Sequence, residues 1–333
     1  MKALVTGGGG FLGQAVVRGL RQRGAQVRSF SRQAHAGLDA LGVEQLRGDL
    51  ADAAAVDAAV AGRDVVFHVA AKPGIWGDYG EYHRANVVGT QNVIAACRRQ
   101  GVQKLVYTSS PSVVFDGRDM EGADESVPYS VNYAARYAAH YPKTKAMAEQ
   151  LVRAANDAQL ATVSLRPHLI WGPGDNHLLP RLVARARAGQ LARIGSRVNL
   201  IDTVYVDNAA DAHLLAADRL APGSPVAGKV YFISQGEPVP MWDMVNRLLD
   251  AAGAPRVTRA VPVWLALALA WGFETAHRVT ANPREPRLTR FVVHEMSTAH
   301  WFDISAARRD LGYAPAISIA AGLEILKKEL NKP

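Results

Sequence analysis

Short apolar runs alternate with amphipathic segments through the first half of the chain. The runs have strand length and lie at residues 2–6, 26–31, 43–47, 64–71, 104–108 and 161–165. Segments with apolar residues at helical spacing lie between them, at 14–23, 51–61 and 81–100. Strands that alternate with helices predict an α/β fold with a doubly wound parallel sheet.

A run of glycines joins the first predicted strand to the first predicted helix. Gly7, Gly10 and Gly13 have the spacing Gly-x-x-Gly-x-x-Gly. In a strand–turn–helix context, such glycines permit a tight turn, close approach of a pyrophosphate and close packing of the helix on the sheet. We therefore predict a dinucleotide site here. The alternative is a merely flexible loop, which the flanking strand and helix disfavour.

The end of the second predicted strand indicates which dinucleotide binds. NAD-preferring proteins place an acid here on the ribose hydroxyls. This chain has Ser31 and Arg32 instead, and no Asp or Glu occurs from Gly24 through Gly37. Because a guanidinium pairs well with phosphate, Arg32, with Arg28 nearby, favours the 2′-phosphate of NADPH/NADP⁺. The alternative is a surface arginine without a role.

Tyr141 and Lys145 are four residues apart, which places them one helical turn from each other. A phenol has a pKa near ~10, so acid–base work at neutral pH requires a shift of several units. We expect the Lys145 ammonium and a bound cofactor's charge to supply it. Since proline is tolerated only in the first turn, Pro142 places Tyr141 near the start of its helix. Alone, this pair also fits a solvated helix face.

Hydroxyl side chains follow the run at 104–108. Thr108, Ser109, Ser110 and Ser112 stand at its carboxyl end. That end of a parallel strand faces the ligand crevice in doubly wound folds. A hydroxyl there would hold a carbonyl oxygen while hydride arrives, but the pattern alone does not select one of the four. His68 lies in an apolar run, which favours a hydrogen-bonded core histidine over a ligand.

Composition and charge narrow the classes of partner. With 333 residues, of which 49% are hydrophobic, the chain can bury the core of one large or two closely joined domains. The net charge is +8, but Lys and Arg are scattered, so we expect no nucleic-acid partner. The single Cys97 excludes an internal disulfide and fits a reducing cytoplasm. We expect no signal peptide ahead of the first strand, and we predict no metal site.

One apolar segment has several interpretations. Residues 261–271 are too few for a transmembrane span, which needs about 20 apolar residues. A buried helix or a lid over the substrate is the favoured interpretation, and peripheral contact with a membrane is the alternative. The loop at 72–82, rich in Gly and aromatic residues, is expected to form one wall of a substrate pocket.

Motifs along residues 1 to about 240 occur in a characteristic order. They lie at 6–13, 48–50, 68–71, 86, 107–110, 141–145 and 165–175. This order resembles that of the extended short-chain dehydrogenase/reductases, which have a Rossmann core. The resemblance implies a core of residues 1–167, to which 201–234 return, and a smaller C-terminal substrate-binding region of 168–200 and 235–333.

The resemblance also implies roles for individual residues. Ser110 would bind the carbonyl, Tyr141 would donate the proton, and Lys145 would hold the nicotinamide ribose and tune Tyr141. The implied cofactor-binding residues are Gly7, Gly10, Phe11, Leu12, Gly13, Ser31, Arg32, Asp49, Leu50, Ala70, Ala71, Lys72, Asn86, Tyr141, Lys145 and Pro167. The implied substrate residues are Trp76, Ser110, Ser112, Tyr141 and Trp171.

The C-terminal motifs narrow the family further. The segments 286–291, 300–305 and 307–315 are similar to those of the 3β-hydroxysteroid dehydrogenase branch. Those at 72–77, 169–175 and 231–238 resemble bacterial 2-alkyl-3-oxoalkanoate reductases of long-chain olefin biosynthesis. This implies NADPH-dependent reduction of a 2-alkyl-3-oxoalkanoic acid. The alternatives are a 3β-hydroxysteroid or sterol-4-carboxylate 3-dehydrogenase and, less favoured, a nucleotide-sugar epimerase; a cofactor-sensing binding protein would not need the intact Ser, Tyr and Lys set.

Such a substrate is hydrophobic and carries a carboxylate. The expected contacts are Trp76 and residues 261–271 for the alkyl chains, and one of Arg84, Arg118, Arg136 and Arg193 for the carboxylate. For each arginine the alternative is a solvated face. The resemblance further implies a homodimer and association with other enzymes of the olefin pathway.

Overall fold

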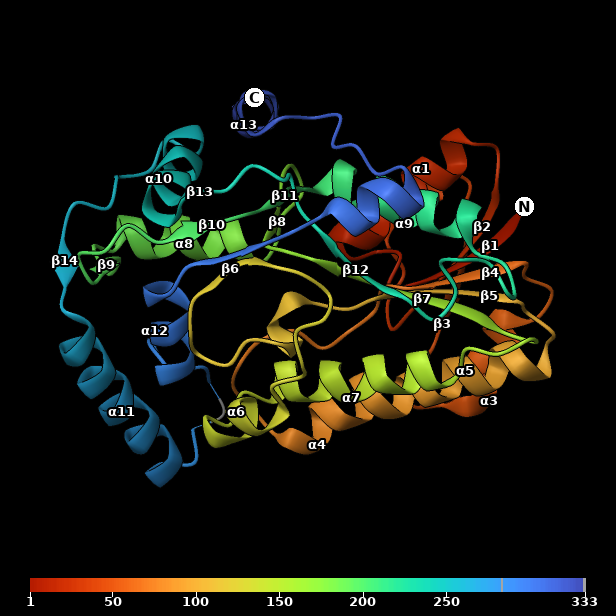
Figure 1. Ribbon diagram of the computed structural model, residues 1–333, viewed down its shortest axis with the longest axis horizontal. Helices are drawn as coiled ribbons and strands as arrows, with labels where there is room; N and C mark the ends of the chain where they lie inside the picture. The colour runs from red at the N-terminus through yellow and green to blue at the C-terminus, as the bar shows by residue number, and fades with distance from the viewer. Residues whose placement is uncertain (283, 332–333) are drawn as a thin grey trace.

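The computed structural model describes residues 1–282 and 284–331. A seven-stranded parallel sheet crosses the molecule with the order β12-β7-β5-β4-β1-β2-β3 (Figure 1). Its strands are β1 (Lys2–Thr6), β2 (Gln26–Ser31), β3 (Glu44–Arg47), β4 (Val65–His68), β5 (Lys104–Thr108), β7 (Ala161–Pro167) and β12 (Val230–Ile233). The predicted doubly wound α/β fold is confirmed.

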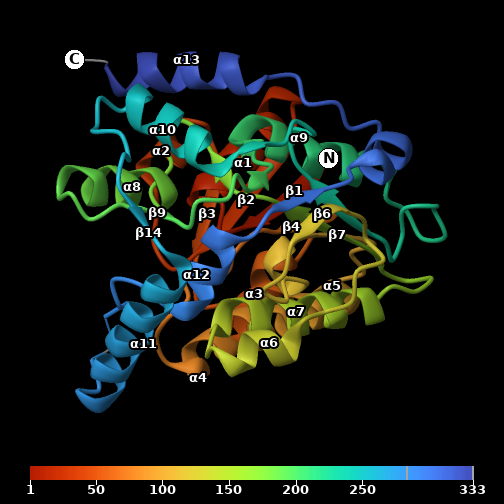
Figure 2. The same ribbon diagram turned by 60° about the vertical axis from the view of Figure 1, so that its left-hand side comes forward.

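Helices cover both faces of this sheet. Figures 1 and 2 show α1 (Phe11–Gln22) and α9 (Val206–Arg219) on one face, and α3 (Ala53–Val60), α5 (Gly89–Arg99) and α7 (His140–Ala154) on the other. The helix predicted at 81–100 consists of α4 (Tyr79–Tyr82), a π-helix (His83–Val88) and α5. Shorter elements are α2 (Ala36–Asp39), α6 (Val131–Arg136) and a 3₁₀ turn (Pro111–Val113).

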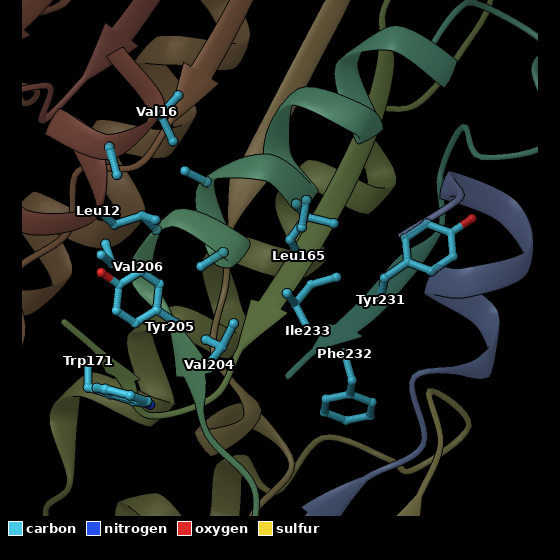
Figure 3. Packing of buried hydrophobic residues seen from close by; sticks show 14 of the residues in the cluster. Leu12, Val16, Leu165, Trp171, Val204, Tyr205, Val206, Tyr231, Phe232 and Ile233 are labelled. Carbon is cyan, nitrogen blue, oxygen red and sulfur yellow. The ribbon is translucent and has the colours of Figure 1, made fainter. Parts of the chain in front are cut away.

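The sheet is apolar on both faces. Successive residues of a strand point to opposite sides, so an unbroken apolar run places apolar side chains on each face. Val5 and Val106 belong to the hydrophobic cluster under α1 and α9, whereas their neighbours Leu4 and Leu105 belong to the cluster under α3 and α5. Figure 3 shows part of the first cluster, in which Leu12, Val16, Leu165, Val206 and Ile233 come together from four elements. This packing accounts for the unbroken apolar runs in the sequence.

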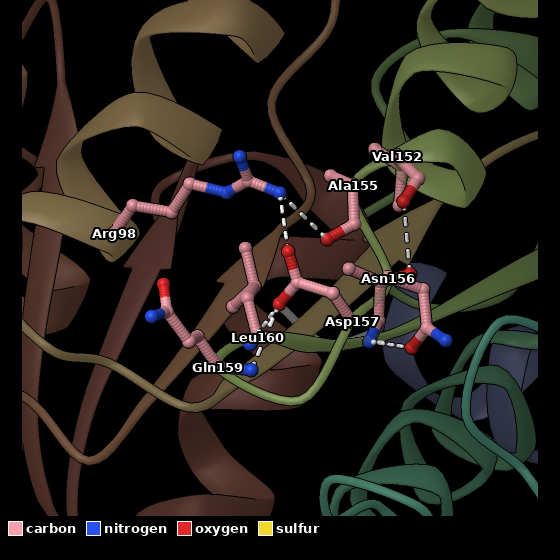
Figure 4. Close-up of polar contacts among 8 residues, drawn as sticks. Arg98, Val152, Ala155, Asn156, Asp157, Gln159 and Leu160 are labelled. Carbon is pink, nitrogen blue, oxygen red and sulfur yellow. Dashed lines mark hydrogen bonds and ion pairs between the residues drawn. The ribbon is translucent and has the colours of Figure 1, made fainter.

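A polar loop fixes the C-terminal end of α7 (Figure 4). Asp157 accepts hydrogen bonds from the backbone of Gln159 and Leu160 and pairs with Arg98 of α5 at 2.8 Å. Arg98 also donates to the carbonyl of Ala155, a group left unpaired at the helix end. These contacts hold α7 to α5 and to the start of β7.

The second region is assembled from short pieces. A four-stranded sheet has the order β13-β10-β15-β6, and two smaller pairs join β11 to β8 and β14 to β9. The strands are β6 (Met120–Ala123), β8 (Ile170–Trp171), β9 (Arg193–Ile194), β10 (Leu200–Ile201), β11 (Val204–Tyr205), β13 (Val239–Pro240), β14 (Ala260–Val261) and β15 (His300–Phe302). Because β6 lies within residues 1–167, this sheet crosses the predicted boundary between the two regions.

Five helices surround the second region. They are α8 (Leu178–Arg187), α10 (Met241–Ala251), α11 (Val263–Val279), α12 (Arg290–Ser297) and α13 (Ile319–Leu330), and a π-helix (Ala307–Leu311) precedes α13. The predicted region 235–333 also includes residues 283, 332 and 333, which lie outside the described residues.

The favoured interpretation of residues 261–271 was a buried helix or a substrate lid, and the buried helix is wrong. Val261 ends β14, and 263–271 form the first half of α11, which lies at the periphery in both views (Figures 1 and 2). Its buried residues are Ala266, Ala270 and Glu274, whereas Trp264 is 70% and Trp271 58% exposed. Ala266 and Ala270 thus face the molecule, whereas the two tryptophans face solvent. Within the described chain, no helix combines the length and apolarity needed to cross a membrane.

Candidate active site

The glycine turn after β1 has the shape expected of a dinucleotide cradle. Gly7 has φ +70°, and a Cβ on it would lie 2.9 Å from the Cα of Ala70. A Cβ on Gly13 would lie 2.0 Å from the Gly7 carbonyl oxygen. The N-terminus of α1, at Phe11 and Leu12, has no side-chain cap, so its first N–H groups are directed at a ligand. These residues fit a bound pyrophosphate.

The end of β2 lies beside this cradle. Ser31 Oγ donates to the Gln33 carbonyl at 2.7 Å, and Arg32 is exposed. His35, which the sequence analysis did not single out, packs against the turn, since a Cβ on Gly9 would lie 1.9 Å from its ring. Arg28 does not join them. It pairs with Glu44 at 2.9 Å and donates to the carbonyls that end α3, so the expectation for Arg28 is wrong.

Asp49 and Leu50 follow β3 at the adenine side of the predicted site. Asp49 pairs with Arg84 at 2.9 Å on the surface. Arg84 is therefore engaged away from the substrate cavity described below, and we withdraw it as a carboxylate ligand. The Leu50 carbonyl accepts a hydrogen bond from Asn92 at 2.8 Å, which holds the segment after β3 against α5.

Asn86 fixes the chain after β4. Its side chain bonds both the N–H and the carbonyl of Lys72, at 2.7 and 3.2 Å, and donates to Thr144 of α7 at 3.0 Å. The segment Ala70, Ala71 and Lys72 is thus tied to the catalytic helix by one amide. The π-helix around Asn86 aims this side chain inward, and Lys72 Nζ pairs with Glu81 at 2.8 Å.

His68 behaves as a core histidine. It is 1% exposed and hydrogen-bonded by both ring nitrogens, to Thr6 at 2.7 Å and to Thr90 at 3.0 Å. Burial lowers its pKa to about 3, which keeps the ring neutral. The prediction that His68 is not a ligand fits these contacts.

Tyr141 and Ser110 form a polar pair at the carboxyl end of the sheet. Tyr141 is the second residue of α7 and Pro142 the third, as the proline predicts. Burial raises the pKa of Tyr141 to about 12, and a hydrogen bond with Ser110 opposes this shift. Ser110 Oγ also lies 2.9 Å from Ser112 Oγ. The structure therefore brings together two of the three predicted catalytic side chains directly.

Lys145 lies one turn further along α7 but faces another group. Its Nζ donates to the Thr108 carbonyl and lies 4.1 Å from the centre of the Tyr107 ring. Burial lowers the pKa of Lys145 to about 7, and Glu149 opposes this shift. The tuning of Tyr141 by Lys145 therefore stays a prediction for the enzyme with bound cofactor.

A buried ion pair lies beneath these residues. Arg166 and Glu149 are 1% and 0% exposed and share two hydrogen bonds of 2.6 and 3.0 Å. Tyr129 donates to the same carboxylate at 2.7 Å. Although burial raises the pKa of Glu149, the bonds from Arg166 keep it below its usual value. Sequence spacing gave no signal for this pair, because its members are 17 residues apart on different elements.

A cavity of about 420 Å³ opens at Ser112, which follows Ser110, although neither Ser110 nor Tyr141 lines it. Its walls are mostly apolar and come from α8, α10, α12 and the ends of β5 and β7. Pro167 ends β7, and the predicted substrate residues Ser112 and Trp171 line the cavity just beyond. From the loop at 72–82, Gly74 and Ile75 form part of one wall, as expected.

Several predicted substrate contacts do not line this cavity. Trp76 packs edge-on against His277 of α11 at 6.1 Å, and residues 261–271 are outside the wall. Arg118, Arg136 and Arg193 are also outside it. The prediction from the sequence was wrong at this point, because residues 285–296, and not 261–271, complete the wall. The arginines that do line the cavity are Arg181, Arg185 and Arg287.

The inner end of the cavity carries polar groups that sequence reasoning missed. His168 and His300 lie there with ring centres 5.0 Å apart, and His168 Nδ1 bonds Asp202 at 2.5 Å. Burial raises the pKa of Glu295, which also lines the cavity, to about 7. Within the described residues, no group of His, Cys, Asp and Glu side chains is arranged to hold a metal ion.

Residues 4–263 match the model of the 3-beta hydroxysteroid dehydrogenase/isomerase family. The chain belongs to this family. It is an extended short-chain dehydrogenase/reductase, as the motif order predicts, and the named relatives are oxidoreductases that act on hydroxyl or keto groups.

Two bacterial relatives have the same name. A "2-alkyl-3-oxoalkanoate reductase" from Stenotrophomonas maltophilia is 54% identical over 98% of each chain. Another, from Shewanella oneidensis, is 48% identical over 98% of this chain and 86% of that one. A mouse "sterol-4-alpha-carboxylate 3-dehydrogenase, decarboxylating" is more distant, at 35% identity over 97% and 89%.

Solved structures support the fold. The crystal structure of gox2253 superposes with a TM-score of 0.77 at 28% identity, over 98% of this chain and 96% of that one. A UDP-glucuronic acid 4-epimerase from Bacillus cereus in complex with NAD gives 0.74 at 21% identity, over 99% and 98%. At that identity the second likeness concerns the fold alone.

Proposed function

We propose that the protein reduces a 2-alkyl-3-oxoalkanoic acid to the 2-alkyl-3-hydroxyalkanoic acid with NADPH, as a step of long-chain olefin biosynthesis. The observation that carries this proposal is the 54% identity over 98% of both chains to a protein named as such a reductase. The site supports it, because Ser110, which is hydrogen-bonded to Tyr141, has its Oγ 2.9 Å from Oγ of Ser112, a residue that lines a largely apolar cavity of about 420 Å³.

The proposed chemistry divides between the cofactor and the chain. The nicotinamide, when bound, supplies hydride to C3 of the substrate. Ser110 and Tyr141 hold the 3-oxo oxygen, and the Tyr141 hydroxyl gives its proton to that oxygen as the C–O double bond becomes a single bond. Lys145 holds the nicotinamide ribose and favours the resulting phenolate.

NADPH, rather than NADH, is the second part of the proposal. Ser31 and Arg32 stand at the end of β2 beside the glycine turn, and no carboxylate occurs from Gly24 through Gly37. A guanidinium in this place binds a 2′-phosphate, whereas an acid would repel it. The ring of His35 packs on the same glycine turn, at Gly9.

Steroid oxidation is the second candidate. The mouse relative named as a sterol-4-alpha-carboxylate 3-dehydrogenase matches 97% of this chain, and its substrate by name also carries a carboxylate. Its lower identity of 35% places it behind the acyclic oxo acid. A nucleotide-sugar epimerase is supported only by likeness of fold.

The deciding experiment measures reduction of NADP⁺ and NAD⁺ by a long-chain 2-alkyl-3-hydroxy acid. This direction avoids the 3-oxo acid, which loses CO₂ unaided. A 4-carboxysterol is tested alongside. We expect fast NADP⁺-linked turnover of the acyclic acid; turnover of the sterol alone would move the protein to the steroid branch, and inertness toward both would contradict the proposal.

We further propose a cytoplasmic homodimer that works with other olefin-pathway enzymes and contacts the membrane peripherally through α11. Trp264 and Trp271 stand exposed on this helix, and aromatic residues of this kind are favoured at membrane interfaces. The exposed Arg259 and Arg278 flank the helix and complement anionic lipid headgroups. Co-sedimentation with anionic vesicles tests this contact.

A further inference from the structure

The position of the substrate's carboxylate is restricted by its own chemistry. In a 3-oxo acid, the carboxyl carbon is two bonds from the carbon that receives hydride, which is at most ~3 Å. A group that binds this carboxylate must therefore lie close to Ser110 and Tyr141. This argument rests on the proposed function.

The cavity arginines are badly placed for this task, and one of them, Arg287, is exposed to solvent. Arg181 and Arg185 come from α8, and Arg181 is already paired with Glu285. Helix α8 packs against α10, in the second region, and not against the ends of the central strands. These arginines therefore line the side of the wall that α8 forms.

His168 occupies the position that the carboxylate requires. It directly follows β7, and Ser110 nearly follows β5, the neighbouring strand in the sheet. The Ser109 N–H donates to the Leu165 carbonyl at 2.6 Å, so the two chain segments leave the sheet side by side. His168 and Ser112 line the same cavity.

Asp202 fixes the orientation of the His168 ring. Its side chain is completely buried and accepts from His168 Nδ1 at 2.5 Å and from the Phe302 N–H at 2.9 Å. Within residues 1–282 and 284–331, no Lys or Arg pairs with Asp202, and no residue bonds His168 Nε2. Because Nδ1 is bound to Asp202, Nε2 is the ring nitrogen left for a ligand.

We propose that His168, oriented by Asp202, binds the substrate's carboxylate through Nε2–H, so that a histidine–aspartate pair and not an arginine selects 3-oxo acids. The pair holds the Nε2–H donor beside the reacting carbonyl, and it binds the acid in the register that brings C3 to Tyr141.

Of the polar side chains at this part of the cavity, only His168 is suited to bind the carboxylate. His300 donates from Nε2 to the Glu295 carbonyl at 2.8 Å, and its buried Nδ1 has no partner among the described residues. Burial lowers the pKa of His300 to about 4, so the ring is neutral and Nδ1 only accepts. Burial raises the pKa of Glu295 to about 7, and in its protonated form it does not repel a second carboxylate.

The test compares a 2-alkyl-3-hydroxy acid with its methyl ester as substrates for oxidation by NADP⁺. The ester keeps the shape and the reacting alcohol but removes the charge. For the unmodified enzyme we expect kcat/KM for the acid to exceed that for the ester by about 10- to 100-fold, the usual range for a hydrogen bond to a charged group. In His168→Gln this ratio falls to near one, mainly because kcat/KM for the acid falls.

Two further variants keep the test decisive. Asp202→Asn preserves shape and is expected to lower the same ratio, and it replaces His168→Gln should that variant not fold. Arg185→Gln removes a cation from the outer wall and is expected to keep the ratio. Circular dichroism and NADP⁺ binding, followed by fluorescence, establish that each variant is folded.

The outcomes separate this inference from the proposed function. Equal losses on acid and ester in His168→Gln, or a ratio that collapses in Arg185→Gln instead, would overturn the assignment of His168 while leaving the reductase intact. An unmodified enzyme that turns over acid and ester equally well would also overturn the assignment of His168. An unmodified enzyme inactive on both would overturn the proposed function itself.

Discussion

In two helices, α7 and α11, the residues that are buried and exposed are the reverse of those that hydropathy predicts. Helix α7 is rich in charged residues, yet Lys145 is 2% and Glu149 0% exposed. Helix α11 begins with eleven residues that carry no charge, yet Trp264 is 70% and Trp271 58% exposed. Burial is thus decided by what packs on a helix, and hydropathy alone predicts neither case.

The two helices differ because of the groups that their side chains contact. The buried charges of α7 are hydrogen-bonded, Lys145 to a carbonyl and Glu149 to Arg166, which offsets the cost of removing them from water. The exposed tryptophans of α11 have no such cover, and the helix contacts its neighbours through Ala266, Ala270 and Glu274, which pairs with Arg290 of α12. Polar groups held in a buried place are typical of catalysis, and apolar groups left on a surface are typical of docking.

The largest expected effect is in α7. Tyr141→Phe should lower turnover by about 10²- to 10⁴-fold, because it removes the general acid without changing the shape of the site. Steady-state oxidation of the 3-hydroxy acid measures this effect. NADP⁺ affinity, measured by fluorescence, should be nearly unchanged; full turnover in this variant would contradict the catalytic role of α7.

The next effect is on stability. Glu149→Gln should lower the free energy of unfolding by about 3–5 kcal/mol, since it leaves the buried Arg166 without its charge partner. Denaturant unfolding followed by circular dichroism measures it. The matched control is Glu324→Gln on the exposed surface of α13, expected to change stability by less than about 0.5 kcal/mol. Similar small changes in both variants would show that the α7 pair is not required for stability.

The α11 variants should leave the fold almost untouched. Replacing Trp264 and Trp271 by Gln should change the free energy of unfolding by only about 0.5 kcal/mol per site, because both rings are already in water. The same double variant should lose binding to anionic vesicles. Loss of vesicle binding in Arg118→Gln, which changes an exposed cation away from α11, would instead point to general charge attraction.

The smallest effect is a shift in pH dependence. Burial is the main cause of the raised pKa of Tyr141, and the ionised Glu295 carboxylate raises it further, because a nearby negative charge disfavours the phenolate. Glu295→Gln should therefore lower the pKa of Tyr141. Alcohol oxidation needs the phenolate, so its activity should rise at lower pH in this variant than in the unmodified enzyme. Profiles of kcat/KM against pH measure the shift, and a displacement toward higher pH would contradict the sign.

Much of the nucleotide-binding half was predictable. The apolar runs at 26–31 and 104–108 became β2 and β5 with the same bounds, and the glycine spacing placed the turn against Ala70. Pro142 correctly placed Tyr141 at the start of α7. These features are local, since periodicity, turn geometry and proline sterics act within a few residues.

The substrate half was less predictable for a physical reason. His168 and Asp202 are 34 residues apart, and Glu295 reaches the same cavity from α12. The predicted arginine contacts were wrong, because the positions of charges along the sequence do not show which side chains come together in one wall of the cavity.

The sequence by itself determined the doubly wound sheet, the dinucleotide turn, the Tyr141 helix and the family, because each rests on local patterns. Only the tertiary structure decided that Lys145 faces Thr108, that α11 is exposed, and that His168 and Asp202 meet beside Ser110. Those outcomes depend on packing between elements distant in the chain, which no local pattern encodes.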